Sequence, residues 1–231
     1  MTDTTETRGR VVALASGKGG VGKSTLALAL ADVWAADGHR VTLVDFDAQA
    51  GVTRAAGVAV PSWDNGPPGP VDVHGLTLWP SGRALAGLAP EVLAERLAHA
   101  RAAASLVVVD LSPALTDAAH AVTLEAADVL AVVARCDAAG LPNVAETVAL
   151  AKAARVRCRV VPTFRGGTGL AREAEAFLRG RYGEAVTAAT IPADAKAAEA
   201  PGRGLPVTRS ARRAKVSEAV RALAAELLGG A

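Results

Sequence analysis

The chain has 231 residues and a formal net charge of +2, with 51% hydrophobic, 21% charged and only 3% aromatic residues. Plentiful apolar side chains and a small net charge exclude a disordered chain, and no apolar run approaches the roughly 20 residues that a spanning helix needs. The first residues lack the basic and apolar regions of a signal peptide, so we expect a cytoplasmic protein with reduced cysteines.

Short apolar runs that predict strands alternate along the chain with stretches that predict helices. The predicted strands are 10–16, 41–45, 76–79, 105–110, 129–134, 158–161 and 185–190. The predicted helices are 24–37, 91–104, 117–126, 138–154, 169–181 and 210–228. Continuous apolar strands that alternate with helices indicate a mostly parallel sheet covered on both faces. We therefore predict a doubly wound α/β fold.

The domain organisation follows from the positions of breaker residues. Residues 61–70 (PSWDNGPPGP) hold four prolines and two glycines, which predicts a surface loop. This loop is too short to separate two domains. We expect a flexible tail over residues 1–9 and a single domain over residues 10–231.

A glycine-rich segment follows the first predicted strand and opens the first predicted helix. It reads GKGGVGKS and fits the pattern G-x-x-x-x-G-K-[ST] in the context that this pattern requires. Backbone N–H groups of such a loop surround a phosphate, while Lys23 neutralises phosphate charge and Ser24 offers its hydroxyl to Mg²⁺. The expected nucleotide contacts are Gly17, Lys18, Gly19, Gly20, Val21, Gly22, Lys23, Ser24 and Thr25.

Three aspartates stand at the ends of predicted strands. Asp45 and Asp47 follow the second strand, and Asp110 ends the run SLVVV. The carboxyl ends of parallel strands form the ligand crevice of an open sheet, so these carboxylates are expected beside the phosphate loop. Mg²⁺ takes hard oxygen ligands and keeps several waters, so one or two of these carboxylates, acting through water, would complete its site with Ser24.

The string from Lys18 to Thr25, KGGVGKST, resembles the deviant Walker A motif of the ParA/MinD superfamily. The resemblance implies a P-loop ATPase fold that uses ATP and Mg²⁺. It also implies that the extra lysine, Lys18, crosses the interface of an ATP-bound homodimer and reaches the partner's nucleotide. There it would stabilise charge that develops during phosphoryl transfer.

Two further segments are similar to motifs of the same superfamily. Residues 44–49 (VDFDAQ) resemble its D-x-D-P-Q segment, which implies that Asp47 orients the attacking water. Residues 106–113 (LVVVDLSP) resemble its Walker B strand and D-x-P-P switch, which implies that Asp110 serves Mg²⁺. Ala48 and Ser112 stand where the superfamily has proline.

The C-terminal third continues the resemblance. The pair Ile191-Pro192, the AEAP stretch at 198–201 and the GLPV stretch at 204–207 match a ParA-like order of motifs. The resemblance implies that Ile191 and Pro192 pack on the adenine. From the residues alone, a turn and a core position would explain these two side chains equally well.

The net charge is distributed unevenly. Residues 1–150 carry −6 and residues 151–231 carry +8. A positive field of this kind suits a polyanion, although a solvated arginine-rich surface would look the same. The resemblance implies that the ATP-bound dimer binds DNA without sequence preference, through phosphate contacts. The candidate arginines are Arg165, Arg172, Arg181, Arg203, Arg209, Arg212 and Arg213.

The resemblance implies an ATP hydrolase of weak intrinsic activity that segregates a chromosome or plasmid at the nucleoid. A ParB-like centromere-binding partner would stimulate hydrolysis. One alternative is a ParA-like ATPase that positions a non-DNA cargo. Another is a MinD-like membrane-associated regulator of the division site. Because residues 211–228 contain no Trp or Phe to insert in a bilayer, no membrane binding is expected.

Overall fold

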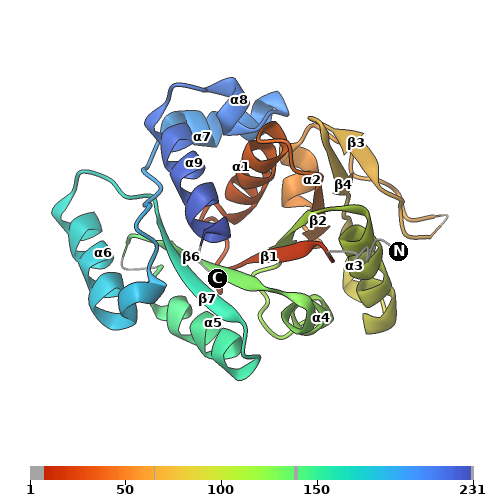
Figure 1. The fold of residues 1–231 in the computed structure, drawn as a ribbon, viewed down its shortest axis with the longest axis horizontal. Helices are drawn as coiled ribbons and strands as arrows, with labels where there is room; N and C mark the ends of the chain where they lie inside the picture. The colour runs from red at the N-terminus through yellow and green to blue at the C-terminus, as the bar shows by residue number, and fades with distance from the viewer. Residues whose placement is uncertain (1–7, 65, 138–139, 230–231) are drawn as a thin grey trace, which may run out of the picture.

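The computed structural model describes residues 8–64, 66–137 and 140–229. Within these ranges seven strands form one sheet, in the order β3-β4-β2-β5-β1-β6-β7 (Figure 1). The strands are β1 Arg10–Ala15, β2 Val41–Phe46, β3 Val71–Val73, β4 Leu76–Trp79, β5 Leu106–Leu111, β6 Val129–Arg135 and β7 Arg157–Thr163. Neighbouring strands are parallel except in the β3–β4 hairpin. The predicted doubly wound, mostly parallel fold is therefore confirmed.

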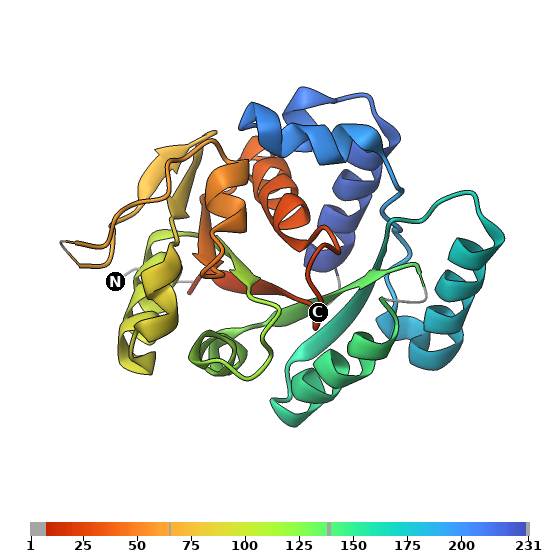
Figure 2. The same cartoon turned by 180° about the vertical axis from the view of Figure 1, so that it is seen from behind.

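Helices cover both faces of this sheet, as the two opposite views show (Figures 1 and 2). One face carries α1 Lys23–Ala36, α2 Gly51–Ala55, α7 Ala195–Glu199, α8 Val207–Ser210 and α9 Lys215–Leu228. The other carries α3 Pro90–Ala103, α4 Ala118–Ala126, α5 Pro142–Ala153 and α6 Gly169–Tyr182. Short 3₁₀ turns complete the described secondary structure, namely η1 Arg83–Gly87, η2 Gly183–Ala185 and η3 Ala200–Arg203. None of the described helices is both long and apolar enough to cross a membrane.

The central strand β1 shows why the strand sequences read as continuous apolar runs. Val12 and Leu14 pack into the core on the α1 and α9 side. Val11, Ala13 and Ala15 pack into the core on the α3 to α6 side. Successive side chains of a strand point to opposite faces, so a strand with helices on both sides needs apolar residues at every position.

The predicted strand at 185–190 is wrong. Residues 183–185 form η2, and only Val186 makes an isolated bridge, to Val160. Beyond it, the backbone N–H groups of Ala188 and Ala189 donate to the Glu226 carboxylate at 3.0 and 3.1 Å. The Thr187 N–H still donates to the Val160 carbonyl of β7. The next two donors are satisfied on a side chain of α9, so the segment does not continue as a strand of the sheet.

The predicted helix at 210–228 is wrong in its first turn. The chain forms α8, leaves helical geometry at Ala211 (φ −142°, ψ 56°), and starts α9 at Lys215. Ser217 Oγ donates to the carbonyl oxygens of Val207 and Ala211, which stabilises this break. The predicted helix at 138–154 begins at Pro142, and residues 138–139 lie outside the described ranges.

The expected N-terminal tail over 1–9 falls mostly on residues 1–7, which lie outside the described ranges. Gly9 is buried, and its backbone N–H donates to the Arg101 carbonyl at 3.3 Å. The Arg101 guanidinium donates back to the Gly9 carbonyl at 2.7 Å. The chain is thus already tied to α3 one residue before β1.

Candidate nucleotide-binding site

The glycine-rich loop connects the C-terminal end of β1 to the first residue of α1. Gly20 and Gly22 have φ values of 75° and 86°, a left-handed conformation that side-chain-bearing residues rarely adopt. Gly22 caps α1, and its carbonyl accepts the Leu26 N–H at 2.9 Å. The positive end of the α1 dipole therefore faces the loop, which is the arrangement that binds phosphate.

Lys23 and Ser24 meet on one carboxylate at the end of β5. Lys23 Nζ donates to Asp110 Oδ1 at 2.8 Å, and Ser24 Oγ donates to Asp110 Oδ2 at 2.6 Å. Lys23 is 6% exposed and Asp110 is fully buried. A hydroxyl oxygen and a carboxylate oxygen in contact are hard ligands, so this donor set fits Mg²⁺.

Asp45 lies beside Asp110 in the paired strands β2 and β5. Its Oδ1 accepts the Asp47 N–H at 3.1 Å, and its Oδ2 accepts the N–H and hydroxyl of Thr53 at 2.9 and 2.7 Å. Burial, and then the nearby charge of Asp110, raise the pKa of Asp45 to about 7. Asp45 therefore fixes the backbone that carries Asp47. Its own carboxylate lies next to that of Asp110.

The turn after β2 brings Asp47 and α2 to the same edge. Asp47 is buried, and its Oδ1 accepts the Gln49 N–H at 2.8 Å. Ala50 adopts a left-handed conformation, and α2 starts directly after it at Gly51. A Cβ on Gly51 would lie 2.6 Å from Ser24 Oγ, so only glycine allows α2 to approach the hydroxyl this closely.

An apolar cavity of about 110 Å³ lies between the phosphate loop and the segment that carries Ile191 and Pro192. Ile191 and Pro192, the predicted adenine contacts, line it together with Val21 and Thr25 of the loop and with Phe164. The ring of Phe164 lies 3.2 Å from the place where a Cβ on Gly22 would stand. The cavity thus joins the phosphate loop to the predicted base-contacting residues, and sequence reasoning missed Phe164.

Arg135, at the end of β6, is a second residue that sequence reasoning missed. Its guanidinium lies 4.2 Å from the centre of the Phe164 ring and donates to the Gly20 carbonyl at 3.2 Å. Asp137 forms an ion pair with it. A third cation therefore stands at the phosphate loop beside the two predicted lysines. Lys18, the first of those, is half-buried, and its carbonyl accepts the Ser16 hydroxyl at 2.9 Å.

The seven candidate DNA-binding arginines have different surroundings. Arg165 pairs with Glu175, and Arg209 pairs with the buried Asp32. Arg209 is nevertheless exposed, as are Arg172, Arg181, Arg203, Arg212 and Arg213. Arg203 forms a solvent-exposed pair with Glu199, which solvent screens strongly. Arg165 and Arg209 thus each contribute an ion pair to the fold, and the seven arginines stay candidates for contact with a polyanion.

The loop, the buried lysine, the strand-end carboxylates and the parallel sheet define a P-loop nucleotide-binding protein. The family model described as the CobQ/CobB/MinD/ParA nucleotide binding domain matches residues 12–207. The chain belongs to this family, as its resemblance to ParA and MinD proteins predicts.

Known proteins of this family resemble the chain over almost its whole length. The chromosome-partitioning ATPase Soj of Thermus thermophilus is 34% identical over an alignment of 240 positions, which covers 95% of this chain and 95% of its own. The chromosome partitioning protein ParA of Caulobacter vibrioides is 27% identical, over 95% of this chain and 94% of its own. Cobyrinic acid a,c-diamide synthase of Mycobacterium smegmatis, solved with an ATP analogue and magnesium, shares the fold with a TM-score of 0.79 at 24% identity, over 95% of this chain and 94% of its own.

Proposed function

We propose that the chain is a partition ATPase of the ParA type, which binds ATP at the phosphate loop, dimerises, and binds DNA without sequence preference. The observation that carries the proposal is the contact of Lys23 and Ser24 with Asp110, in a chain 34% identical to a chromosome-partitioning ATPase. The magnesium site and the nucleotide contacts are part of the proposal.

In the proposed reaction the residues of the loop bind and orient the triphosphate. Backbone N–H groups between Gly19 and Ser24 surround the β-phosphate, and Lys23 moves from Asp110 to the phosphate charge. Ser24 and Asp110 would hold Mg²⁺, with Asp45 behind them, and the bound ion would supply positive charge beside the phosphate oxygens. Asp47 holds the attacking water, and Ile191 and Pro192 pack on the adenine.

The dimer and its partners are proposed from the family resemblance and from charge. Lys18 reaches the nucleotide of a second copy and makes ATP part of the dimer interface. Exposed arginines of the basic C-terminal third contact DNA phosphates, and a ParB-like partner stimulates hydrolysis. The protein then cycles between free and nucleoid-bound states as ATP is bound and hydrolysed.

A gel shift with DNA of arbitrary sequence, run with ATP, with ADP and without nucleotide, tests the central step. We expect DNA retention with ATP alone. Lys23→Ala should abolish retention, whereas Lys152→Ala, which removes an exposed lysine from α5, should not. Retention that is equal in all three nucleotide states would contradict nucleotide-switched DNA binding, and a negative result with retained ATP binding would favour a non-DNA cargo.

A further inference from the structure

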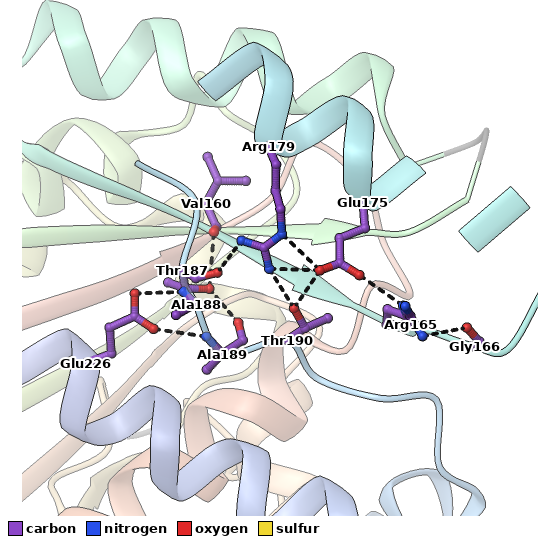
Figure 3. Close-up of polar contacts among 10 residues, drawn as sticks. All are labelled: Val160, Arg165, Gly166, Glu175, Arg179, Thr187, Ala188, Ala189, Thr190 and Glu226. Atoms are coloured by element: carbon purple, nitrogen blue, oxygen red, sulfur yellow. Dashed lines mark hydrogen bonds and ion pairs between the residues drawn. The ribbon is translucent and has the colours of Figure 1, made fainter. Parts of the chain in front are cut away.

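The segment between Val186 and Ala193 connects α6 to the cavity of the nucleotide site. It carries Ile191 and Pro192, which line that cavity. It belongs neither to a helix nor to a strand. Two backbone bonds tie it to β7, because the Thr187 N–H donates to the Val160 carbonyl and the Ile191 N–H donates to the Pro162 carbonyl, both at 2.9 Å. Figure 3 shows that polar side chains from two helices hold it as well.

Glu175 of α6 is the centre of the contacts on one side of the segment. Its Oε2 accepts Arg165 Nε at 2.9 Å, and its Oε1 accepts two donors of Arg179 at 2.8 and 3.0 Å. The same Oε1 accepts the Thr190 hydroxyl at 3.2 Å. These contacts join a helix, the loop after β7 and the residue before Ile191 at one carboxylate (Figure 3).

The Glu175 carboxylate is 16% exposed, and its neighbours keep it ionised. Burial alone would raise its pKa, but hydrogen bonds from Arg179 and Arg165 outweigh burial and hold the pKa of Glu175 below its usual value. Hydrogen bonds to a charged acceptor are about twice as strong as neutral ones. The cluster therefore resists displacement better than a set of neutral contacts would.

Arg165 passes this constraint to the base-contacting residues through its backbone. Its N–H donates to the Ile191 carbonyl at 3.2 Å, and its carbonyl accepts the Ala193 N–H at 3.2 Å. Pro192 stands between these two bonds. The backbone of Arg165 therefore contacts the segment on both sides of Pro192, and the ion pair with Glu175 fixes the side chain of the same residue.

The opposite side of the segment is held by α9. Glu226 accepts the N–H groups of Ala188 and Ala189 and pairs with Arg159 of β7. Arg179 adds a bond to the Thr187 carbonyl at 3.2 Å. The segment is thus held at its start by Glu226, Arg179 and β7. At the end that lines the cavity, the contacts of Glu175 with Arg165 and Thr190 add to the backbone bond between Ile191 and Pro162.

We propose that Glu175 is a positioning residue for base recognition: it holds Arg165 and Thr190 so that Ile191 and Pro192 form the wall against which the purine base packs. This inference rests on the proposed ATP-binding function. Glu175 does not line the cavity, so it acts through these neighbours. Its loss should weaken the base contact and leave the phosphate contacts of the loop unchanged.

The test compares a ligand that has a base with one that lacks it. Isothermal titration calorimetry of the full chain with Mg²⁺–ATP and with Mg²⁺–tripolyphosphate gives both affinities. We expect Glu175→Gln to weaken ATP binding about tenfold, the loss of roughly one charge-assisted hydrogen bond, with no change for tripolyphosphate. Glu173→Gln, which removes the same charge from an exposed site on α6, should change neither affinity.

A second variant keeps the test decisive if Glu175→Gln folds poorly. Thr190→Val removes a single hydroxyl of the cluster without a change of charge. It should weaken ATP binding by a smaller factor than Glu175→Gln and leave the affinity for tripolyphosphate unchanged. Equal loss of both ligands, or unchanged ATP binding, would overturn the positioning role. A parent protein that binds neither ligand would overturn the proposed ATP-binding function itself.

Discussion

Asp110 accepts hydrogen bonds from two consecutive residues at the start of α1, Lys23 and Ser24. The Lys23–Asp110 pair is buried, and a buried pair is stable only while both partners keep good contacts. A phosphate bound in the loop competes with Asp110 for the ammonium group. The Ser24 hydroxyl and the Asp110 carboxylate, which are in contact at 2.6 Å, are the proposed metal ligands.

Gly51→Ala tests how closely α2 must approach this pair. The new Cβ would stand 2.6 Å from Ser24 Oγ, so Ser24 or α2 has to shift. We expect magnesium-dependent ATP affinity to fall at least tenfold, measured by calorimetry with and without Mg²⁺. Gly69→Ala is the matched control, because its Cβ would meet nothing within 4 Å. Unchanged affinity in Gly51→Ala would show that the close approach is not needed.

Asp47→Asn tests the proposed water-positioning role. The amide oxygen can still accept the Gln49 N–H, so the turn should persist. The carboxylate charge is lost, and the rate of ATP hydrolysis should fall by about 10²-fold or more, in the range for loss of a group that activates water. Fluorescent-nucleotide binding should stay within about twofold of the parent. A normal single-turnover rate would remove Asp47 from the reaction.

At the level of elements, α4 begins with a side-chain cluster behind the Walker B strand. Asp117 caps the helix by accepting the His120 N–H at 2.9 Å, and it also contacts the His120 ring at 2.8 Å. Ser112, which stands where the superfamily has a switch proline, donates its hydroxyl to the same carboxylate. The substitution noted in the sequence thus gives the segment after Asp110 a polar attachment to α4.

Asp117→Ala should lower the free energy of unfolding by about 1–2 kcal/mol, the usual cost of a lost N-cap, at neutral pH. Burial raises the pKa of Asp117, but the hydrogen bonds from His120 and Ser112 lower it by a larger amount. The pKa of Asp117 in the folded protein therefore lies below its usual value. As the pH falls, Asp117 is protonated in the unfolded chain before it is protonated in the folded protein. The stabilisation by the Asp117 charge is therefore present above about pH 4 and is lost as the pH falls below that value.

Urea unfolding at pH 7 and at pH 3.5 measures this difference. The difference in the free energy of unfolding between the parent and Asp117→Ala should be smaller at pH 3.5 than at pH 7. Asp64→Ala, in an exposed loop, should match the parent at both values. An equal gap at both pH values would assign the stabilisation to the helix cap alone, without the charge.

At the scale of the whole molecule, the proposed ATP-bound dimer depends on Lys18. Lys18→Ala should keep monomeric ATP binding, since Lys23 still serves the bound phosphates. Light scattering with ATP should then report a monomer for Lys18→Ala and a dimer for both the parent and Lys152→Ala. A dimer in all three would end the cross-subunit role.

DNA binding is the second property of the whole molecule. The double substitution Arg212→Glu and Arg213→Glu reverses two exposed charges before α9 and should abolish the ATP-dependent gel shift. Arg40→Glu, at an exposed site before β2, should leave most of it. The parent's affinity should also fall steeply with salt, because phosphate contacts release counterions. A salt-independent affinity would contradict this mode of binding.

The sequence by itself determined the sheet class, the phosphate loop and the strand-end carboxylates. These features follow from short local patterns and from one rule, that parallel strands present their carboxyl ends at a common edge. The pairing of Asp45 with Asp110 depends on the strand order and register of β2 and β5, which the structure shows. The same rule says nothing of residues outside the motifs.

Only the tertiary structure decided which side chains support the site. Phe164 and Arg135 reach the loop from strand ends that carry no motif, and Glu175 reaches the segment of the predicted base contacts from a helix without a motif. It also showed that Arg165 and Arg209 form ion pairs with Glu175 and Asp32. Such contacts join residues distant in sequence, and the packing of helices on the sheet determines which of them meet, so no local pattern could have indicated them.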